Sequence, residues 1–189
     1  KGYFLKDRLI KAPKRKTLNF WDKLNKNSEK IIPAIGGVDA HCLIVKKYFI
    51  KFKIFPYKSM FKRLNNVLYL NNPLTDNFEQ NKKEILSKIK NGNNLIINSK
   101  ISKEIPNIEI KNLKTKIGIG EKITLDEDTN LLVNTKIKKA FINIIKDGKI
   151  IYRTNKTNFS LKLTEKGKYR IEIKKGKFGF AYSNPMIVE

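Results

Sequence analysis

The chain has 189 residues, of which 40% are hydrophobic and 10% aromatic. This length predicts one large or two short domains, and no apolar stretch approaches the roughly 20 residues needed to cross a bilayer. The single cysteine excludes an internal disulfide, and no signal-like segment follows Lys1. We therefore expect a soluble, cytoplasmic fragment whose natural start lies upstream of Lys1.

The formal net charge is +24, from 41 Lys and Arg against 17 Asp and Glu. Such an excess can bind nucleic acid by releasing counterions from phosphates. The lysines, however, are spread along the whole chain, and few positions carry the guanidinium fork that suits phosphates and bases. The arginines are Arg8, Arg15, Arg63, Arg153 and Arg170. We interpret the charge as a solvated, lysine-rich surface, and nucleic-acid binding as a third option.

Helical spacing appears first near the beginning of the chain. Leu18, Trp21 and Leu24 recur at the spacing of one helical face, and Thr17 is a suitable N-cap. The pattern predicts a short helix over residues 17–27, with Trp21 in its core rather than stacked on a substrate.

The next segment predicts a buried strand followed by a loop. Residues 31–35 (IIPAI) are almost all apolar, and Gly36 and Gly37 then allow a tight turn. Residues 43–70 are aromatic and irregular, and we expect these rings to pack beneath a long loop that ends in a strand at 67–70.

A helix and a strand complete the first half. Asp76 and Glu79 resemble a capping box, and one apolar helical face continues until Asn91-Gly92. A strand over 95–97 follows. Strand, helix and strand in this order are typical of an α/β unit. Residues 100–106 read as a boundary, which predicts an α/β domain over 1–104.

Short alternating runs dominate residues 105–189. Asp147-Gly148 between two isoleucine pairs predicts a two-residue hairpin. Residues 159–164 and 169–174 alternate between apolar and polar, so each strand should have one buried and one wet face. About seven such strands predict an all-β, immunoglobulin-like sandwich.

The motif that could bind a metal or take part in catalysis is residues 36–41 (GGVDAH), which contains the chain's single histidine. In extended backbone, side chains two residues apart project to the same side, so Asp39 and His41 can point at one centre. A carboxylate oxygen beside an imidazole nitrogen suits a divalent metal such as zinc, manganese or iron. The same pair could serve as an acid–base dyad or as a purely structural hydrogen bond. Cys42 should face the other way, as a small buried filler.

Residues 36–41 resemble the last metal-binding motif of the polymerase-and-histidinol-phosphatase (PHP) metallohydrolases. The similarity continues through the branch that includes carbaryl-hydrolase-like proteins, at residues 20–24 (FWDKL), 55–57 (FPY), 67–70 (VLYL), 73–74 (PL), 91–92 (NG), 146–149 (KDGK) and 183–185 (SNP). The resemblance implies that 1–104 is the end of a distorted (β/α)7 barrel and that 105–189 is an appended sandwich.

The resemblance also implies roles for the two residues. Asp39 and His41 would be metal ligands, with Asp39 also able to orient the attacking water. The family's other ligands, an early His-x-His pair among them, have no counterpart in this chain. We therefore expect a part of a metal-dependent phosphoesterase or related ester hydrolase that is inactive alone. Lys58, Lys62 and Arg63 are candidates for steadying a small anionic ester.

A binding module is the alternative function. A β-sandwich can present exposed aromatic side chains to carbohydrate or protein, but the fold itself implies no ligand. Phe178, Phe180 and Tyr182 are the candidates, and they could equally form the buried face of a strand. The two readings differ in whether these rings are exposed.

Overall fold

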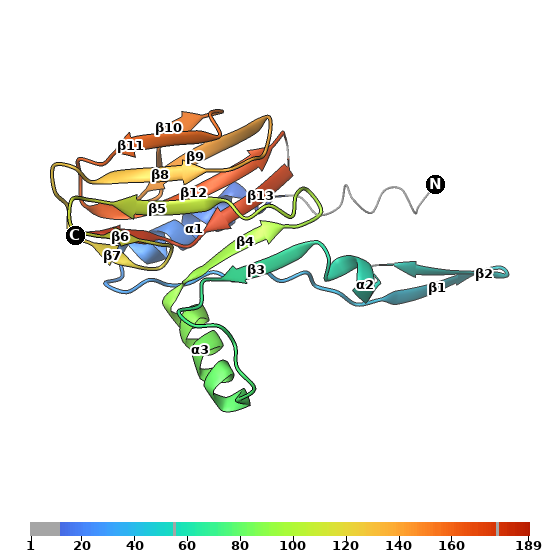
Figure 1. Ribbon diagram of the computed structural model, residues 1–189. Helices are drawn as coiled ribbons and strands as arrows, with labels where there is room; N and C mark the ends of the chain where they lie inside the picture. Colours follow the sequence, from blue (N-terminus) through green and yellow to red (C-terminus); the bar gives the residue numbers. More distant parts are fainter. Residues whose placement is uncertain (1–11, 55, 177) are drawn as a thin grey trace.

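The computed structural model describes residues 12–54, 56–176 and 178–189, so Arg8 and Phe55, named above, lie outside it. The protein is mostly β, with three sheets and few helices (Figure 1). The elements are α1 (Arg15–Lys26), β1 (Leu43–Lys47), β2 (Ile50–Ile54), α2 (Tyr57–Met60), β3 (Leu64–Leu68), α3 (Phe78–Asn91), β4 (Asn94–Asn98), β5 (Asn107–Lys111), β6 (Lys116–Ile117), β7 (Lys122–Ile123), β8 (Asn130–Asn134), β9 (Ala140–Lys146), β10 (Lys149–Thr154), β11 (Asn158–Lys162), β12 (Gly167–Lys175), β13 (Phe178–Ser183) and β14 (Met186–Val188).

Two of the sheets form the body of the molecule. The larger has eight strands in the order β10-β9-β12-β13-β4-β3, with β14 bonded to β12 and β7 bonded to β14. The smaller has four strands in the order β11-β8-β5-β6. The β14–β7 pair is parallel, and the other pairs among the described strands are antiparallel.

One hydrophobic core joins these two sheets. Ile144 and Ile171 from the larger sheet, and Ile110 and Leu131 from the smaller, are all 0% exposed and belong to the same buried cluster. Fully burying such a side chain stabilises a fold by about 1.5–3 kcal/mol. Packing of the two sheets against each other is therefore the main source of stability.

Local sequence signals are confirmed at three places. Helix α1 forms close to the predicted range, but Lys14 is its N-cap and the predicted cap, Thr17, lies inside the helix. Helix α3 ends at Gly92, whose φ of 75° suits a left-handed C-cap. The N-cap of α3 is Asn77 rather than Asp76, because the Asn77 side chain accepts a hydrogen bond from the Gln80 backbone N–H. Positive φ at Asp147 and Gly148 confirms the two-residue hairpin between β9 and β10.

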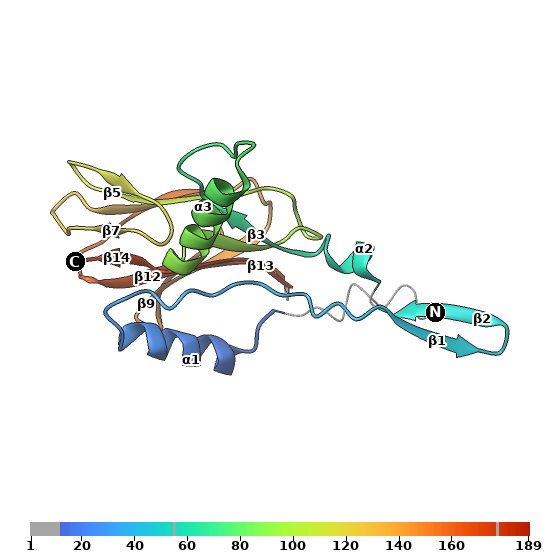
Figure 2. The same cartoon turned by 90° about the horizontal axis from the view of Figure 1, so that it is seen from below.

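The strand predicted at residues 31–35 does not form. These residues belong to an extended strap, residues 31–42, that runs alongside α1 beneath the larger sheet without joining it (Figure 2). Asparagine side chains replace a neighbouring strand as hydrogen-bond partners. Asn184 Oδ1 accepts from Ala34 N at 2.7 Å, and Asn66 Oδ1 accepts from Gly36 N at 2.8 Å.

The β3–β4 pair continues the sheet of the C-terminal part. β4 pairs with β13, with Ile97 opposite Ala181, so one sheet crosses the boundary expected between residues 104 and 105. The described residues close no barrel, and β3 and β4, which α3 connects, run antiparallel. The division into two domains stays a prediction.

The wet face expected for β12 is wrong. Arg170 is 2% and Glu172 is 0% exposed, although both alternate with the core residues Tyr169, Ile171 and Ile173. Helix α1 covers this face of the sheet (Figure 2). The alternation correctly separated two faces, but it could not show that a distant helix covers the polar one.

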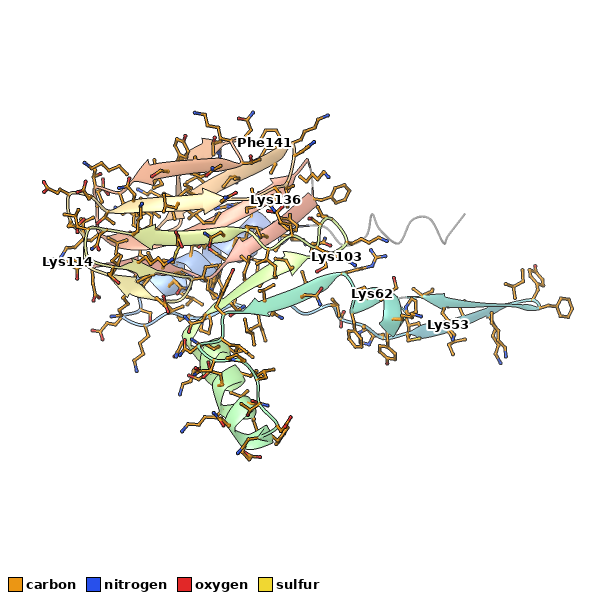
Figure 3. The ribbon with its side chains drawn as sticks, viewed as in Figure 1. Lys53, Lys62, Lys103, Lys114, Lys136 and Phe141 are labelled. Carbon is orange, nitrogen blue, oxygen red and sulfur yellow. The ribbon has the colours of Figure 1, made fainter. Side chains whose placement is uncertain are left out.

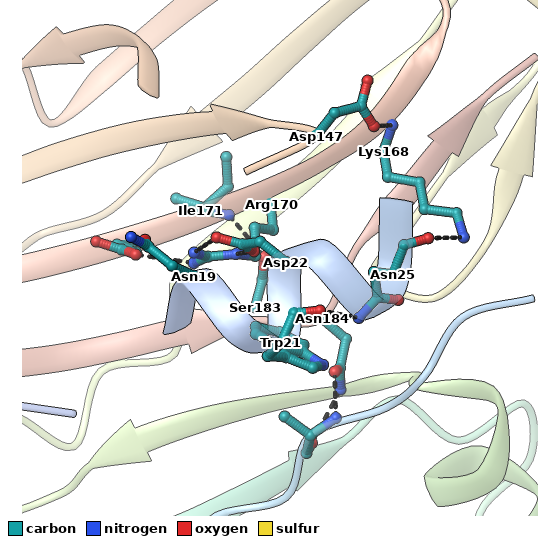
Figure 4. A network of polar contacts seen from close by, with 12 residues as sticks. Asn19, Trp21, Asp22, Asn25, Asp147, Lys168, Arg170, Ile171, Ser183 and Asn184 are labelled. Carbon is teal, nitrogen blue, oxygen red and sulfur yellow. Dashed lines mark hydrogen bonds and ion pairs between the residues drawn. The ribbon is translucent and has the colours of Figure 1, made fainter. Parts of the chain in front are cut away.

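A network of charged side chains joins α1 to β12 (Figure 4). Arg170 binds Asp22 with two guanidinium nitrogens, one of them at 2.7 Å, and donates to Glu172 at 2.9 Å. Arg15 donates to the same Glu172 oxygen at 2.8 Å, and the Trp21 ring lies 5.2 Å from the Arg170 guanidinium carbon. The buried carboxylate of Asp22 is therefore paired with Arg170, and that of Glu172 with Arg170 and Arg15.

The other end of α1 is held by the same strand. Lys168 Nζ donates to the backbone carbonyls of Asn25, Ser28 and Lys30 at 2.7, 2.6 and 3.0 Å. An ammonium suits this position, because carbonyls at a helix C-terminus carry partial negative charge. Strand β12 thus contacts α1 at both ends.

The network predicts a pH dependence of stability. Burial alone would raise the pKa of Glu172, but Arg170, with Arg15 and Lys174, outweighs burial and holds that pKa below its ordinary value. A carboxyl whose pKa is lower in the folded than in the unfolded chain stabilises the fold. This contribution is fully present above the unfolded pKa, about 4.3, and is lost as the pH falls through the folded pKa. We expect the free energy of unfolding, measured in urea, to fall less steeply below about pH 4.3 in Glu172→Gln than in the wild type. The exposed Glu127→Gln should keep the wild-type slope, and equal slopes in all three proteins would contradict the role of Glu172.

Candidate functional site

The strap places Asp39 and His41 just before β1. Gly36 lies so close to the sheet that a Cβ there would be 2.7 Å from Ile96 Cγ2 and 3.1 Å from Leu64. A residue with a Cβ at position 36 would therefore push these side chains aside where the strap passes the edge formed by β3 and β4. Beyond this point the strap leaves the body and leads into the projecting β1–β2 hairpin (Figure 1).

The two side chains converge, but not through the extended backbone that the prediction assumed. His41 Nε2 lies 2.7 Å from Asp39 Oδ1, and the side chains are 62% and 90% exposed. Asp39 has a φ of 48°, a left-handed conformation in which Asp is one of the better tolerated residues. The pair is open to solvent, so other groups can reach it.

The donor set of this pair fits a divalent metal in part. Two ligands at ordinary zinc distances would have their N and O atoms about 3.0–3.4 Å apart, so a small opening of the hydrogen bond would admit an ion. A catalytic centre usually takes three protein ligands and an open position. Among the described residues, no group of three or more His, Cys, Asp and Glu side chains could hold a metal. Asp39 and His41 can therefore supply part of a metal centre.

The three candidate anion-binding residues have different environments. Lys58 in α2 and the following Lys62 are exposed, and Figure 3 shows Lys62 beside α2 near the hairpin. Arg63 is only 5% exposed and approaches Ser59 Oγ at 3.5 Å. Of the three, the two lysines have the surface access that an anionic substrate needs.

Lysines also occur far from this region. Figure 3 shows Lys103, Lys114 and Lys136 on the two-sheet body and Lys53 on the hairpin. A phosphate-binding face would gather its cations along one surface. These labelled lysines lie on separate parts of the molecule, and the interpretation of the charge as a solvated surface stays a prediction.

Cys42 and Trp21 take positions beside the candidate site. Cys42 is half-buried rather than buried, with a φ of 49°. Trp21 donates its indole N–H to the Ile32 carbonyl at 2.7 Å, which joins α1 to the strap. This contact, with the stacking on Arg170, gives Trp21 a structural role.

The aromatic residues of β13 are mostly buried. Phe180 is 1% and Tyr182 is 6% exposed, so neither is presented to a large ligand, whereas Phe178 is 37% exposed. The exposed Phe141 lies near Phe178, and both line a shallow cleft at one end of the sheet. The binding-module alternative rests on these two rings.

One feature that the sequence did not reveal is a cavity of about 410 Å³. It lies between α1, the strap and strands β3, β4 and β13, and its walls include Trp21, Ile35, Ile96 and Phe180. Tyr182 also lines it, and burial raises the pKa of its hydroxyl to about 12. The walls come from segments far apart in the chain, so no local motif could have indicated this cavity.

Comparison with known proteins leaves the family assignment open. A scan against protein-family models, a search of curated proteins and a search of solved structures each gave no significant match. In the part of the chain that the structure describes, no helix has the length and apolar character needed to cross a membrane.

Proposed function

We propose that this chain contributes Asp39 and His41 to the divalent metal centre of a metal-dependent phosphoesterase or related ester hydrolase. The convergence of the two side chains to 2.7 Å on an exposed strap is the observation that carries the proposal. In this proposal the remaining ligands come from the parent protein upstream of Lys1, and the chain alone is inactive.

The chemistry assigned to each residue follows from its side chain. Zinc, manganese or iron bound there would make a bound water acidic enough to provide hydroxide near neutral pH. His41 would present a neutral ring nitrogen as ligand, and Asp39 a carboxylate oxygen that binds or orients the water. Lys58 and Lys62 would steady the anionic oxygens of a small phosphoester.

Exposed apolar side chains beside the motif support a missing partner domain. Leu43, Ile44, Val45 and Ile50 in the β1–β2 hairpin are between 43% and 60% exposed. Exposed apolar side chains on both faces of a projecting hairpin are typical of a segment that packs against a partner. We assign that covering surface to the barrel of the parent protein, and the two-sheet body to an immunoglobulin-like sandwich appended to it.

The test is His41→Ala in the full-length parent. We expect bound metal, measured by elemental analysis, to fall, and kcat/KM for a chromogenic phosphoester to drop at least about 100-fold, since even supporting residues of a metal site cost 10–100-fold. Cys42→Ala is the matched control and should keep both values, because its side chain is adjacent but takes no part. Normal metal content and turnover in His41→Ala would show that the motif is not a ligand set.

A further inference from the structure

The tip of the projecting β1–β2 hairpin consists of two aromatic residues at positions where small polar residues are usual. Tyr48 and Phe49 form the two-residue turn between Lys47 and Ile50, which pair across the strands. Tyr48 has a φ of 54°, a left-handed conformation that suits glycine, asparagine or aspartate and strains a bulky residue. Tyr48 is 89% exposed and Phe49 is fully exposed, so packing does not offset the strain. A strained residue held in this way points to a function of the tip.

The cations behind the tip repel one another. Lys46 and Lys51 lie directly opposite each other in the register of the two strands, and like charges in that position destabilise a hairpin. Residues 40–75 contain six lysines and one arginine but no aspartate or glutamate. An anionic surface in front of the tip would therefore relieve a repulsion that the neighbouring sequence does not balance.

The composition of the hairpin favours a lipid surface over nucleic acid as that partner. Residues 43–54 comprise four lysines and eight aliphatic or aromatic residues, with no arginine, asparagine, glutamine, serine or threonine. Nucleic-acid sites use those side chains, together with lysine, to contact phosphates and base edges. Exposed aliphatic side chains such as Ile44 and Ile50, which are 60% and 59% exposed, match the acyl chains beneath a layer of lipid headgroups.

We propose that the hairpin tip inserts into an anionic lipid surface, with Tyr48 and Phe49 below the headgroups and Lys46 and Lys51 beside the lipid phosphates. Each of these lysines is two residues behind a ring, which is about 7 Å along a strand. Interfacial segments are buried to a similar depth, about 5–10 Å.

The inference goes beyond the hydrolase function and does not depend on it. The barrel proposed to cover the hairpin would pack against its strands, whereas the tip is the end of the hairpin that points away from the two-sheet body (Figures 1 and 2). Loss of metal binding in the parent and loss of lipid binding at the tip are therefore separate results.

The test measures co-sedimentation of the full 189-residue chain with lipid vesicles at physiological salt. One set of vesicles contains equal parts of phosphatidylglycerol and phosphatidylcholine, and the other contains phosphatidylcholine alone. We expect binding to the anionic set to be at least about tenfold tighter, because lysines near an anionic surface favour binding.

The variant Tyr48→Gly with Phe49→Asn removes both rings and keeps the turn. Glycine followed by asparagine suits a turn with positive φ at its first residue, so the free energy of unfolding should not fall. Binding to anionic vesicles should weaken at least about tenfold, because two aromatic side chains no longer enter the apolar layer. Phe141→Asn, at a ring 57% exposed on the two-sheet body, is the matched control and should keep the wild-type affinity.

A second pair of variants separates the tip from the general positive charge of the protein. Lys46→Gln with Lys51→Gln should weaken binding to anionic vesicles about 25-fold, the effect of two lysines at such a surface. Lys103→Gln with Lys136→Gln removes the same charge from the body and should weaken binding less than about threefold, because salt screens distant charges.

Insertion itself is measured with Phe49→Trp. Its emission should be quenched by vesicles with brominated acyl chains, whereas the wild type, whose single tryptophan is Trp21, should not be quenched. The proposal is overturned if the wild type does not bind anionic vesicles, if the tip variants bind as the wild type does, if the body variants weaken binding equally, or if Phe49→Trp is not quenched. Tip-dependent binding of a single-stranded oligonucleotide without vesicle binding would also overturn it and would assign the tip to nucleic acid.

Discussion

Replacing Arg170 with methionine is expected to destabilise the folded chain by about 3–5 kcal/mol. Methionine has a similar length, but it leaves Asp22 and Glu172, which are 6% and 0% exposed, without the cation that binds both. Breaking a buried ion pair by removing one partner costs this much because the remaining charge stays buried. Urea-induced unfolding at neutral pH, followed by circular dichroism, measures the change.

Two further variants test this interpretation of Arg170. Arg153→Met, on the exposed face of β10, should change the free energy of unfolding by less than about 0.5 kcal/mol. The triple variant Asp22→Leu, Arg170→Met and Glu172→Leu should recover much of the loss, because buried networks replaced by apolar groups are often neutral. If Arg170→Met lowers the free energy of unfolding no more than Arg153→Met does, the charged network does not stabilise the fold as its burial indicates.

Replacing Gly120 with alanine is expected to cost more than about 3 kcal/mol. The new Cβ would be 2.6 Å from the carbonyl carbon of Gly92 and 2.7 Å from the backbone N of Asn93, and neither backbone atom can move aside alone. The φ of 86° at Gly120 adds about 1–2 kcal/mol of strain for any residue with a Cβ. The loop before β7 would have to separate from the C-cap of α3, which thermal unfolding would record as a lower Tm.

Gly118→Ala is the matched control for Gly120. Its Cβ would approach no atom more closely than Glu121 Oε2 at 3.7 Å, an ordinary contact, and its φ is not in the left-handed region. We expect a change below about 0.5 kcal/mol. Equal effects of the two substitutions would mean that the loop yields easily and that the contact with Gly92 is not important.

Features that depend on a few neighbouring residues could be predicted from the sequence. The hairpin at Asp147-Gly148 and the end of α3 at Gly92 both depend on positive φ, which only a few residue types tolerate. The convergence of Asp39 and His41 is also local, but it occurs with Asp39 in the left-handed region rather than through the extended backbone that was expected. Local geometry is what a sequence pattern reports.

Features that depend on distant segments could not be predicted. Residues 31–35 have the composition of a buried strand, but Asn66 and Asn184 bind the strap without a neighbouring strand. Arg170 and Glu172 look solvent-facing in sequence, yet a helix 148 residues away covers them. The cavity between α1, the strap and the larger sheet could not be predicted for the same reason.

The attachment of α1 to β12 also determines when the first helix can become stable during synthesis. With only 12 residues, α1 is too short to persist in water by itself, and its salt-bridge and carbonyl partners are residues 168, 170 and 172. The ribosome therefore releases the helix long before the strand that stabilises it, so α1 joins the fold only after β12 has been made. A nascent chain that stops short of β12 would leave the amphipathic α1 segment undocked and open to proteases.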